Sequence, residues 1–304
     1  MPSNSLFFNY IKILRFDHWI KQIFVFPGIL LAIYNYSELQ ITFIFFFKIV
    51  IGIFLVSLTA SANYCINEYL DRNNDYYHPL KKKRASVQKK LDVRIVYFIY
   101  FFLIFISLFL SIIFINFNFF LTLIIFLLFG VLYNIKPIRL KDVRYLDIIS
   151  ESANNPIRFI LGYLIVVPTF SFQSDLNIYS VIFYFFFGCF LMSCKRLSEK
   201  NFLKNITDIK KYRISIANYS ITHLSLQVFF YSLISIYFLS KIFEKNSGYS
   251  IFIISIIVCY TEYYNLTLSK SHSAQHPEKL YKEKKLIFLI LISIVLFLLK
   301  FFNI

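Results

Sequence analysis

Several residue types are scarce in this sequence, and each scarcity excludes a class of protein. Acidic residues number 16 against 32 Lys and Arg, and glycine occurs only 6 times in 304 residues. The four cysteines (Cys65, Cys189, Cys194 and Cys259) lie within or beside apolar stretches and have no metal-ligand spacing, so a disulfide framework is not expected. No small-residue cleavage site follows the first apolar stretch, which argues against a cleaved signal peptide.

Apolar residues, by contrast, are abundant. They make up 58% of the chain, and the mean hydropathy is +0.65, which indicates a polytopic membrane protein rather than a soluble domain. The 39 phenylalanines beside so few glycines suggest a compositional bias, so the Phe and Ile runs carry little functional information. We predict an all-α protein with nine transmembrane helices, at roughly 22–37, 41–64, 94–115, 118–134, 146–168, 177–195, 214–240, 249–267 and 285–303.

The net charge of +16 is concentrated in short loops between these spans, which argues against nucleic-acid binding. The loops after the second, fourth, sixth and eighth spans are basic, whereas those after the third and fifth contain no Lys or Arg. By the positive-inside rule the N-terminus and the four basic loops are cytoplasmic, in a protein of the inner (plasma) membrane. No repeat of 20–50 residues is evident, so residues 1–304 are interpreted as a single integral-membrane domain.

The most informative stretch follows the second span and reads NYCINEYLDRNNDYYHPLKKKR, residues 63–84. Asn67, Asp71 and Asp75 recur every four residues, so on a helix they share one face, one turn apart. Oxygen ligands of this kind suit Mg²⁺ that also binds substrate phosphates. His78, Lys81 and Arg84 follow in a cluster that could bind anions. Together they predict a site for a magnesium–diphosphate ester. The alternative is a solvated loop whose lysines only anchor it in the cytoplasm.

Polar residues also interrupt the fifth expected span. Asp147, Glu151, Asn154 and Arg158 follow helical spacing and form one stripe, and Pro156 should kink the helix. A broken, polar helix is tolerated in a membrane where it lines a cavity. A Glu–Arg pair in this position could instead be purely structural.

Two further segments lie on the same membrane face. Lys195, Arg196 and Glu199 occur where the sixth span reaches the surface, although interfacial lysines commonly extend to water without a functional role. His272 and His276 are four residues apart before the last span. Pro277 disfavours a helix there, and no third ligand is evident, so we interpret this segment as a solvated loop rather than a metal site.

Taken together, these motifs resemble the UbiA-type superfamily of intramembrane prenyltransferases. The pattern N-x-x-x-D-x-x-x-D, here Asn67, Asp71 and Asp75, closes the second span. Within the superfamily, the chain looks most similar to the decaprenyl-phosphate phosphoribosyltransferase branch. Four patterns carry that resemblance: His78-Pro79-x-Lys81-x-x-Arg84; Tyr133, Lys141, Asp147, Arg158 and Gly162; Lys195-Arg196-x-x-Glu199; and Pro277-Glu278. The chain departs from the usual pattern at Glu68, Ala85, Lys282 and Lys284.

The resemblance implies an enzyme, its cofactor and its partners. Prenyltransferases that ionise a prenyl diphosphate carry a second aspartate-rich motif near the end of the sixth span, where this chain has Lys195 and Arg196. Cations there would bind a phosphate directly. The implied reaction moves 5-phosphoribosyl from phosphoribosyl diphosphate to a polyprenyl phosphate, using Mg²⁺ held by the Asn67–Asp71–Asp75 motif. The alternative is prenyl transfer to an aromatic or quinone-precursor acceptor. Homo-oligomerisation and isoprenoid length stay open.

The substrate-binding residues that the resemblance implies come from the first three of these patterns. The resemblance assigns them as His78, Lys81, Arg84, Tyr133, Lys141, Asp147, Arg158, Lys195 and Arg196. A transporter or scaffold with a polar cavity is a third interpretation, which would favour inverted repeats that the sequence does not show.

Overall fold

The computed structural model describes residues 3–36, 42–169, 177–203, 206–244, 247–269, 273–275 and 277–301, and every regular element in them is a helix. The all-helical prediction is therefore confirmed for this part of the chain. Its first half comprises α1 (Ser3–Lys12), η1 (Phe16–Val25), α2 (Phe26–Asn35), α3 (Phe43–Asp75), η2 (Lys81–Lys83), α4 (Ala85–Gln88), α5 (Val93–Phe114), α6 (Phe117–Asn134) and η3 (Leu140–Asp142). The second half comprises α7 (Leu146–Ser152), α8 (Asn154–Val166), α9 (Ile178–Phe202), α10 (Ile206–Tyr212), α11 (Ile214–Asn218), α12 (Ile221–Ile242), η4 (Ser247–Tyr249), α13 (Ser250–Leu268), η5 (Ser273–Gln275), η6 (Pro277–Lys282) and α14 (Lys284–Phe301).

Seven helical segments of the described chain are long and apolar enough to cross a membrane: Phe7–Asn35, α3, α5, α6, α9, α12 and α13. The remaining two expected spans correspond to the pair α7 and α8, which is interrupted, and to α14, which carries three lysines (Lys284, Lys285 and Lys300). The count of nine spans and the orientation of the N-terminus stay predictions.

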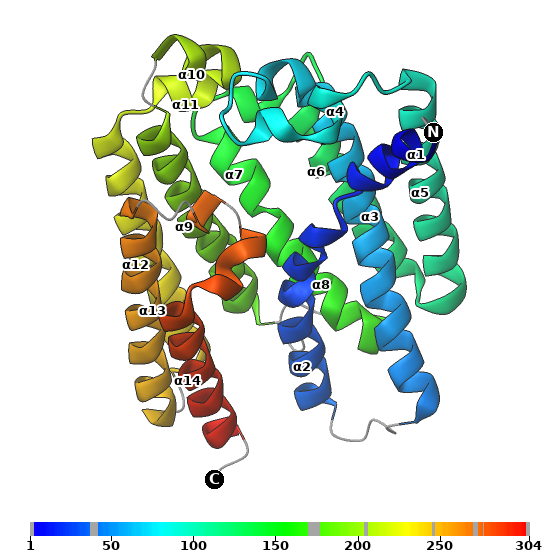
Figure 1. The fold of residues 1–304 in the computed structure, drawn as a ribbon. Helices are drawn as coiled ribbons and strands as arrows, with labels where there is room; N and C mark the ends of the chain where they lie inside the picture. The colour runs from blue at the N-terminus through cyan, green and yellow to red at the C-terminus, as the bar shows by residue number, and fades with distance from the viewer. Residues whose placement is uncertain are drawn as a thin grey trace.

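Two apolar clusters divide the bundle into halves (Figure 1). One half buries residues of α2, α3, α6 and α8 around Leu55, Phe126 and Leu161. The other buries residues of α9, α12, α13 and α14 around Phe190, Leu224 and Tyr260. Because α8 packs against both α2 and α9, it joins the two halves.

Close approach of α2 to α8 depends on two glycines. A Cβ atom at Gly28 would lie 1.9 Å from the carbonyl oxygen of Phe159, and one at Gly162 would lie 1.9 Å from the carbonyl oxygen of Val25. Small residues at such crossings let membrane helices pack backbone against backbone. This contact fixes η1, which precedes α2, beside the polar part of α8.

The fifth expected span is broken, as the proline predicts. Helix α7 ends at Ser152 and α8 begins at Asn154, with Ala153 in a turn between them. Pro156 lies in the first turn of α8, where its missing N–H removes no intrahelical hydrogen bond. The break turns Glu151 and Asn154 toward a polar pocket.

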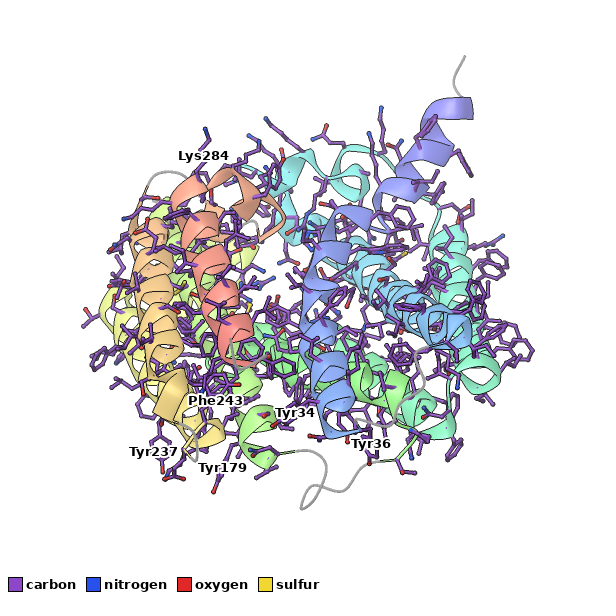
Figure 2. All side chains as sticks on the ribbon, turned by 90° about the horizontal axis from the view of Figure 1, so that it is seen from below. Tyr34, Tyr36, Tyr179, Tyr237, Phe243 and Lys284 are labelled. Carbon is purple, nitrogen blue, oxygen red and sulfur yellow. The ribbon has the colours of Figure 1, made fainter. Side chains whose placement is uncertain are left out.

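The basic loops gather at one end of the bundle. The end of α3 and the short helices η2, α4, α10 and α11 lie together at the upper end in Figure 1. Tyr34, Tyr36, Tyr179 and Tyr237 lie toward the other end, away from Lys284 (Figure 2). Basic loops on one side, with tyrosines at the opposite interface as well, are typical of membrane proteins.

Candidate active site

A pocket of about 200 Å³ lies between the two halves of the bundle. Its lining comes from η1, α3, α6, α7, α8, α9 and η5 and from the loops near the basic end. Among the described residues, the carboxylates of the lining come from Asp71 and Glu151 alone, whereas its cations are Arg15, Lys21, Lys81, Arg84, Arg158, Lys195 and Arg213. Such an excess of cations in a partly desolvated pocket favours a ligand that carries phosphate groups.

Asn67, Asp71 and Asp75 occupy successive turns at the end of α3, as their spacing predicts; we call them the carboxylate ladder. Helix α3 has 33 residues, about 50 Å at 1.5 Å per residue, so its last turns extend past the hydrocarbon core. Asp71 is buried, and its Oδ1 lies 2.5 Å from the ammonium of Lys141 and 2.9 Å from Arg139 Nη2. Its other oxygen, Oδ2, is 3.9 Å from Arg213 Nη2.

Asp75 Oδ2 forms an ion pair with Arg84 Nη1 at 2.5 Å. Asn67 donates its amide nitrogen to the side-chain oxygen of Asn134. That oxygen also accepts from Lys141 at 2.8 Å, while the nitrogen of Asn134 donates to the carbonyl of Gly130 at 2.9 Å. The network fixes both amide orientations, because an ammonium only donates and a carbonyl only accepts.

This arrangement fits a magnesium ion that is shared with a substrate. Asn67 Oδ1, Asp71 Oδ2 and Asp75 Oδ1 accept no hydrogen bond from the described residues. The same residues contain no cluster of three or more His, Cys, Asp or Glu side chains that could hold a metal alone. Two carboxylates and an amide instead match Mg²⁺ that takes its remaining ligands from phosphate oxygens and water.

The loop after α3 is folded around His78. The Nδ1 atom of His78 accepts from the backbone N–H groups of Leu80 and Lys81, each at 3.2 Å, and its ring contacts that of Tyr212. Lys81 Nζ reaches Glu199 Oε1 at 2.7 Å and also contacts the hydroxyl of Tyr212. Burial lowers the pKa of Lys81, and Glu199 opposes that shift. His78 therefore shapes the loop, whereas Lys81 lines the pocket.

Arg196 is the centre of a buried ionic network behind the pocket. Its guanidinium donates to Asp147 Oδ2 at 2.8 Å and to Glu199 Oε2 at 2.7 Å, and Glu151 Oε2 lies 3.4 Å away. Asp147 also accepts from the hydroxyl of Tyr219 at 2.8 Å. The sequence interpretation put Asp147 and Arg196 against the substrate, but neither is among the residues that line the pocket. Their charges neutralise each other, and direct contact of either residue with a substrate stays a prediction.

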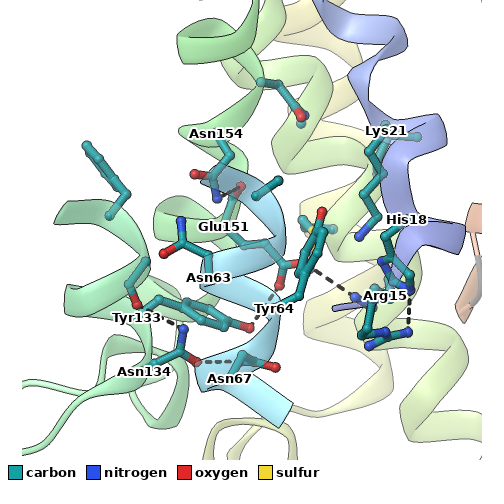
Figure 3. A pocket seen from close by; sticks show the side chains of 18 of the residues that line it. Arg15, His18, Lys21, Asn63, Tyr64, Asn67, Tyr133, Asn134, Glu151 and Asn154 are labelled. Atoms are coloured by element: carbon teal, nitrogen blue, oxygen red, sulfur yellow. Dashed lines mark hydrogen bonds and ion pairs between the residues drawn. The ribbon is translucent and has the colours of Figure 1, made fainter. Parts of the chain in front are cut away.

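Four cations from three helical segments form a separate surface, which we call the basic wall: Arg15, Lys21, Arg158 and Lys195. In Figure 3, Arg15, His18 and Lys21 lie on one side of the pocket, and Tyr133, Asn134 and Asn67 lie on the other. Lys195 Nζ is 3.4 Å from Glu151 Oε1, and Arg158 Nε donates to Gln22 at 3.1 Å.

Seven of the predicted site residues line the pocket: Asn67, Asp71, Lys81, Arg84, Tyr133, Arg158 and Lys195. The other five, Asp75, His78, Lys141, Asp147 and Arg196, lie behind them in ion pairs or hydrogen bonds. His272 and His276 lie outside the described residues.

The sequence interpretation did not assign Arg15, His18, Lys21, Asn63, Arg213 or Gln275 to the pocket. Asn63 carried a readable signal, because it extends the ladder by one more turn at the same spacing. Arg15 and the two η1 residues, His18 and Lys21, carried none, since isolated charges near a first span are common.

Comparison with known proteins relates this chain to a family. Residues 23–292 match the UbiA prenyltransferase family. A search of curated proteins finds no match. Among solved structures, a UbiA homologue from Archaeoglobus fulgidus bound to GPP and Mg²⁺ superimposes with a TM-score of 0.70 at 16% identity, covering 95% of this chain and 99% of that chain. The same homologue bound to Cd²⁺ gives 0.68 at 16% identity, covering 95% and 96%.

A second kind of relative is a digeranylgeranylglyceryl phosphate synthase. It superimposes with a TM-score of 0.61 at 17% identity, covering 96% of this chain and 97% of that chain. At these identities the likeness concerns the fold.

Proposed function

We propose that this chain, which belongs to the UbiA prenyltransferase family, transfers 5-phosphoribosyl from phosphoribosyl diphosphate to a polyprenyl phosphate and releases pyrophosphate. One observation carries the proposal: Asn67 and Asp71 of the ladder line the same pocket as the four cations of the basic wall, and Figure 3 places Asn67 on the side of the pocket opposite Arg15 and Lys21. A metal-bound diphosphate suits the first surface, and a phosphate that brings no metal suits the second.

The donor diphosphate is assigned to the carboxylate ladder. Magnesium bound there would neutralise charge on the diphosphate as it leaves. Such use of Mg²⁺ is in keeping with the Archaeoglobus fulgidus homologue, whose structure contains GPP and Mg²⁺. Lys81, Arg84 and Arg213 line the same region and would donate charge-assisted hydrogen bonds to diphosphate oxygens.

The lipid phosphate is assigned to the basic wall. Lys195, Lys21 and Arg15 would hold it so that one anionic oxygen faces the anomeric carbon of the ribose. That oxygen forms the new C–O bond while the bond to the diphosphate oxygen breaks, and the electron pair leaves with pyrophosphate. Because the attacking oxygen is already an anion, the step needs no strong general base. Apolar spans would enclose the isoprenoid tail.

The ion pairs of Glu199, an acidic partner of Arg196, support the assignment of the diphosphate and the lipid phosphate to different surfaces of the pocket. Glu199 follows the Lys195–Arg196 pair, and its two oxygens accept from Lys81 and Arg196 at 2.7 Å each. Glu199 is therefore neutralised within the protein and does not offer a second metal ligand. The resemblance to the phosphoribosyltransferase branch leads to the same assignment, since that branch lacks the second aspartate motif.

The second candidate is prenyl transfer to an aromatic or quinone-precursor acceptor. The solved structure with GPP and Mg²⁺ favours it, because that homologue shares the fold over 95% of this chain. In that case the prenyl diphosphate would occupy the ladder, and the basic wall would bind an acidic acceptor.

We assign the pocket to the cytoplasmic side of the inner membrane, because the basic loops gather at its end of the bundle. The purified protein, reconstituted with Mg²⁺, tests the reaction. Phosphoribosyl diphosphate with a polyprenyl phosphate should yield pyrophosphate and a phosphoribosyl lipid. Geranyl diphosphate with 4-hydroxybenzoate should yield no prenylated product. The opposite pattern would replace the proposal by the second candidate.

A further inference from the structure

Three side-chain amides of the pocket share one hydrogen-bonding arrangement. Asn63 Nδ2 donates to the carbonyl of Phe126 at 3.2 Å, and Gln275 Nε2 donates to the carbonyl of Ser198 at 3.1 Å. Asn154 Nδ2 likewise donates to a main-chain carbonyl, that of residue 151, at 3.0 Å. A carbonyl oxygen only accepts hydrogen bonds, so in each case the amide nitrogen must face it. The three amide oxygens are thereby fixed as the remaining acceptors.

These oxygens lack donors among the described residues. Asn63 Oδ1 and Gln275 Oε1 are buried without any hydrogen-bond partner, and Gln275 as a whole is only 4% exposed. Asn134 provides the contrast within the same pocket, because its oxygen accepts from Lys141 at 2.8 Å. A buried acceptor without a donor is costly, so such groups call for a partner that the protein itself does not supply.

The chemistry of the missing partner follows from what an amide oxygen accepts. Phosphate oxygens are acceptors at neutral pH and would be repelled, whereas a prenyl chain has no polar hydrogen to donate. Hydroxyl groups are donors of the right kind. Three acceptors among phosphate-binding cations therefore match a ligand that carries both phosphate and several hydroxyls.

We propose that Asn63, Asn154 and Gln275 form a subsite that recognises the ring hydroxyls of a pentose phosphate. The subsite deepens the proposed function and rests on it, because it names how the transferred group would be selected. It also gives η5 a role. Gln275 is held to α9 through Ser198, and this contact positions its amide in the pocket lining.

Binding of two sugar phosphates to the purified full-length protein tests the subsite. Ribose 5-phosphate and 2-deoxyribose 5-phosphate differ by one hydroxyl, and each is titrated calorimetrically in the presence of Mg²⁺ and pyrophosphate. The wild-type protein should bind the ribose compound roughly 10- to 100-fold more tightly, since the deoxy compound leaves an acceptor unpaired. Gln275→Met should reduce this ratio to near one.

Gln227→Met is the matched control, because Gln227 on α12 also has a buried amide oxygen without a partner but does not line the pocket. It should keep the wild-type ratio. If Gln275→Met fails to fold, Asn154→Ala at a half-buried position should weaken the binding of both pentose phosphates, because it removes another acceptor of the subsite.

Two results would overturn the subsite, and they differ in what they say about the reaction. Equal binding of both pentose phosphates by an enzyme that still transfers phosphoribosyl means that water satisfies the amides. Absence of binding by either pentose phosphate, with tight binding of geranyl diphosphate, removes both the subsite and the proposed function.

Discussion

Arg196 Nε lies 2.8 Å from Asp147 Oδ2, and neither side chain is exposed. The contact joins α9 to α7 across 49 residues of sequence. Arg196 therefore organises the pocket from behind, while its neighbour Lys195 reaches the lining and has a partly exposed side chain. Two adjacent cations of one motif thus have different environments, and their substitutions should have different consequences.

Arg196→Ala should mainly lower stability, and Lys195→Ala should mainly weaken substrate binding. Removing Arg196 leaves Asp147 and Glu199 buried with fewer compensating charges, a loss of about 3–5 kcal/mol in unfolding free energy. Removing Lys195 should cost about 1.5–3 kcal/mol in kcat/KM, through a lost charged hydrogen bond to phosphate. Thermal unfolding in detergent and steady-state kinetics measure the two effects.

Lys195→Asp sharpens this comparison. It places a carboxylate near Glu151 and against the bound phosphate, so it should lose more activity than Lys195→Ala at every substrate concentration. If Lys195→Ala turns over both substrates normally, Lys195 only anchors the helix at the interface. The second candidate function, prenyl transfer, would then be as well supported as phosphoribosyl transfer.

Asp71→Asn should abolish most activity while the protein still inserts and folds. Asp71 is the ladder carboxylate that lines the pocket, and losing its hold on the metal should cost several kcal/mol, with each 1.36 kcal/mol about tenfold in rate. Binding of Mn²⁺, followed by electron paramagnetic resonance in the presence of pyrophosphate, should weaken in parallel.

Asp142→Asn provides the control for Asp71→Asn. Asp142 also pairs with Arg139, but its side chain is 29% exposed and it does not line the pocket. Its turnover should stay within about twofold of wild type. Near-normal turnover of Asp71→Asn at saturating Mg²⁺ would make the ladder a structural feature and remove the central argument for a metal-bound diphosphate.

The parts of the site that were predictable lie on single helices. Asn67, Asp71 and Asp75 repeat every four residues, and a helix converts that spacing directly into one face. Pro156 predicted the break in the fifth span for a similar reason, because its effect on the backbone is local. Local rules therefore gave the ladder, the break and the all-helical fold.

Contacts between distant segments were not predictable in this way. Asp71 is paired with Lys141 and Arg139, which follow it by 70 and 68 residues, and no spacing rule connects them. The expected stripe from Asp147 to Arg158 assumed a continuous helix. Once the chain turns at Ala153, Asp147 lies in the Arg196 network and Arg158 in the pocket lining.

Gly162→Ala should destabilise the junction of α2 and α8. The new methyl group would lie 1.9 Å from the carbonyl oxygen of Val25, so the helices must separate. Overpacking of this kind typically costs about 1–3 kcal/mol, and we expect a lower melting temperature in detergent. Gly248→Ala is the control, because its Cβ would meet only the flexible end of Lys300. Equal melting temperatures for the two variants would contradict the packing role of Gly162.

Lys21→Ala tests whether the basic wall binds the lipid rather than the sugar donor. Lys21 lines the pocket from η1, with Nζ 5.4 Å from the ring centroid of Tyr64 on α3. Its removal should raise KM for the polyprenyl phosphate by about 10-fold or more, while KM for phosphoribosyl diphosphate changes little.

The control for Lys21→Ala is Lys12→Ala, a cation at the end of α1 that does not line the pocket. It removes the same charge from the same membrane face, so it reports any general loss of attraction for anionic lipids. Both KM values should then stay near wild type. If Lys21→Ala instead raises only KM for phosphoribosyl diphosphate, the assignment of the two substrates is reversed: the sugar phosphate occupies the basic wall, and the lipid phosphate lies beside Lys81 and Arg84.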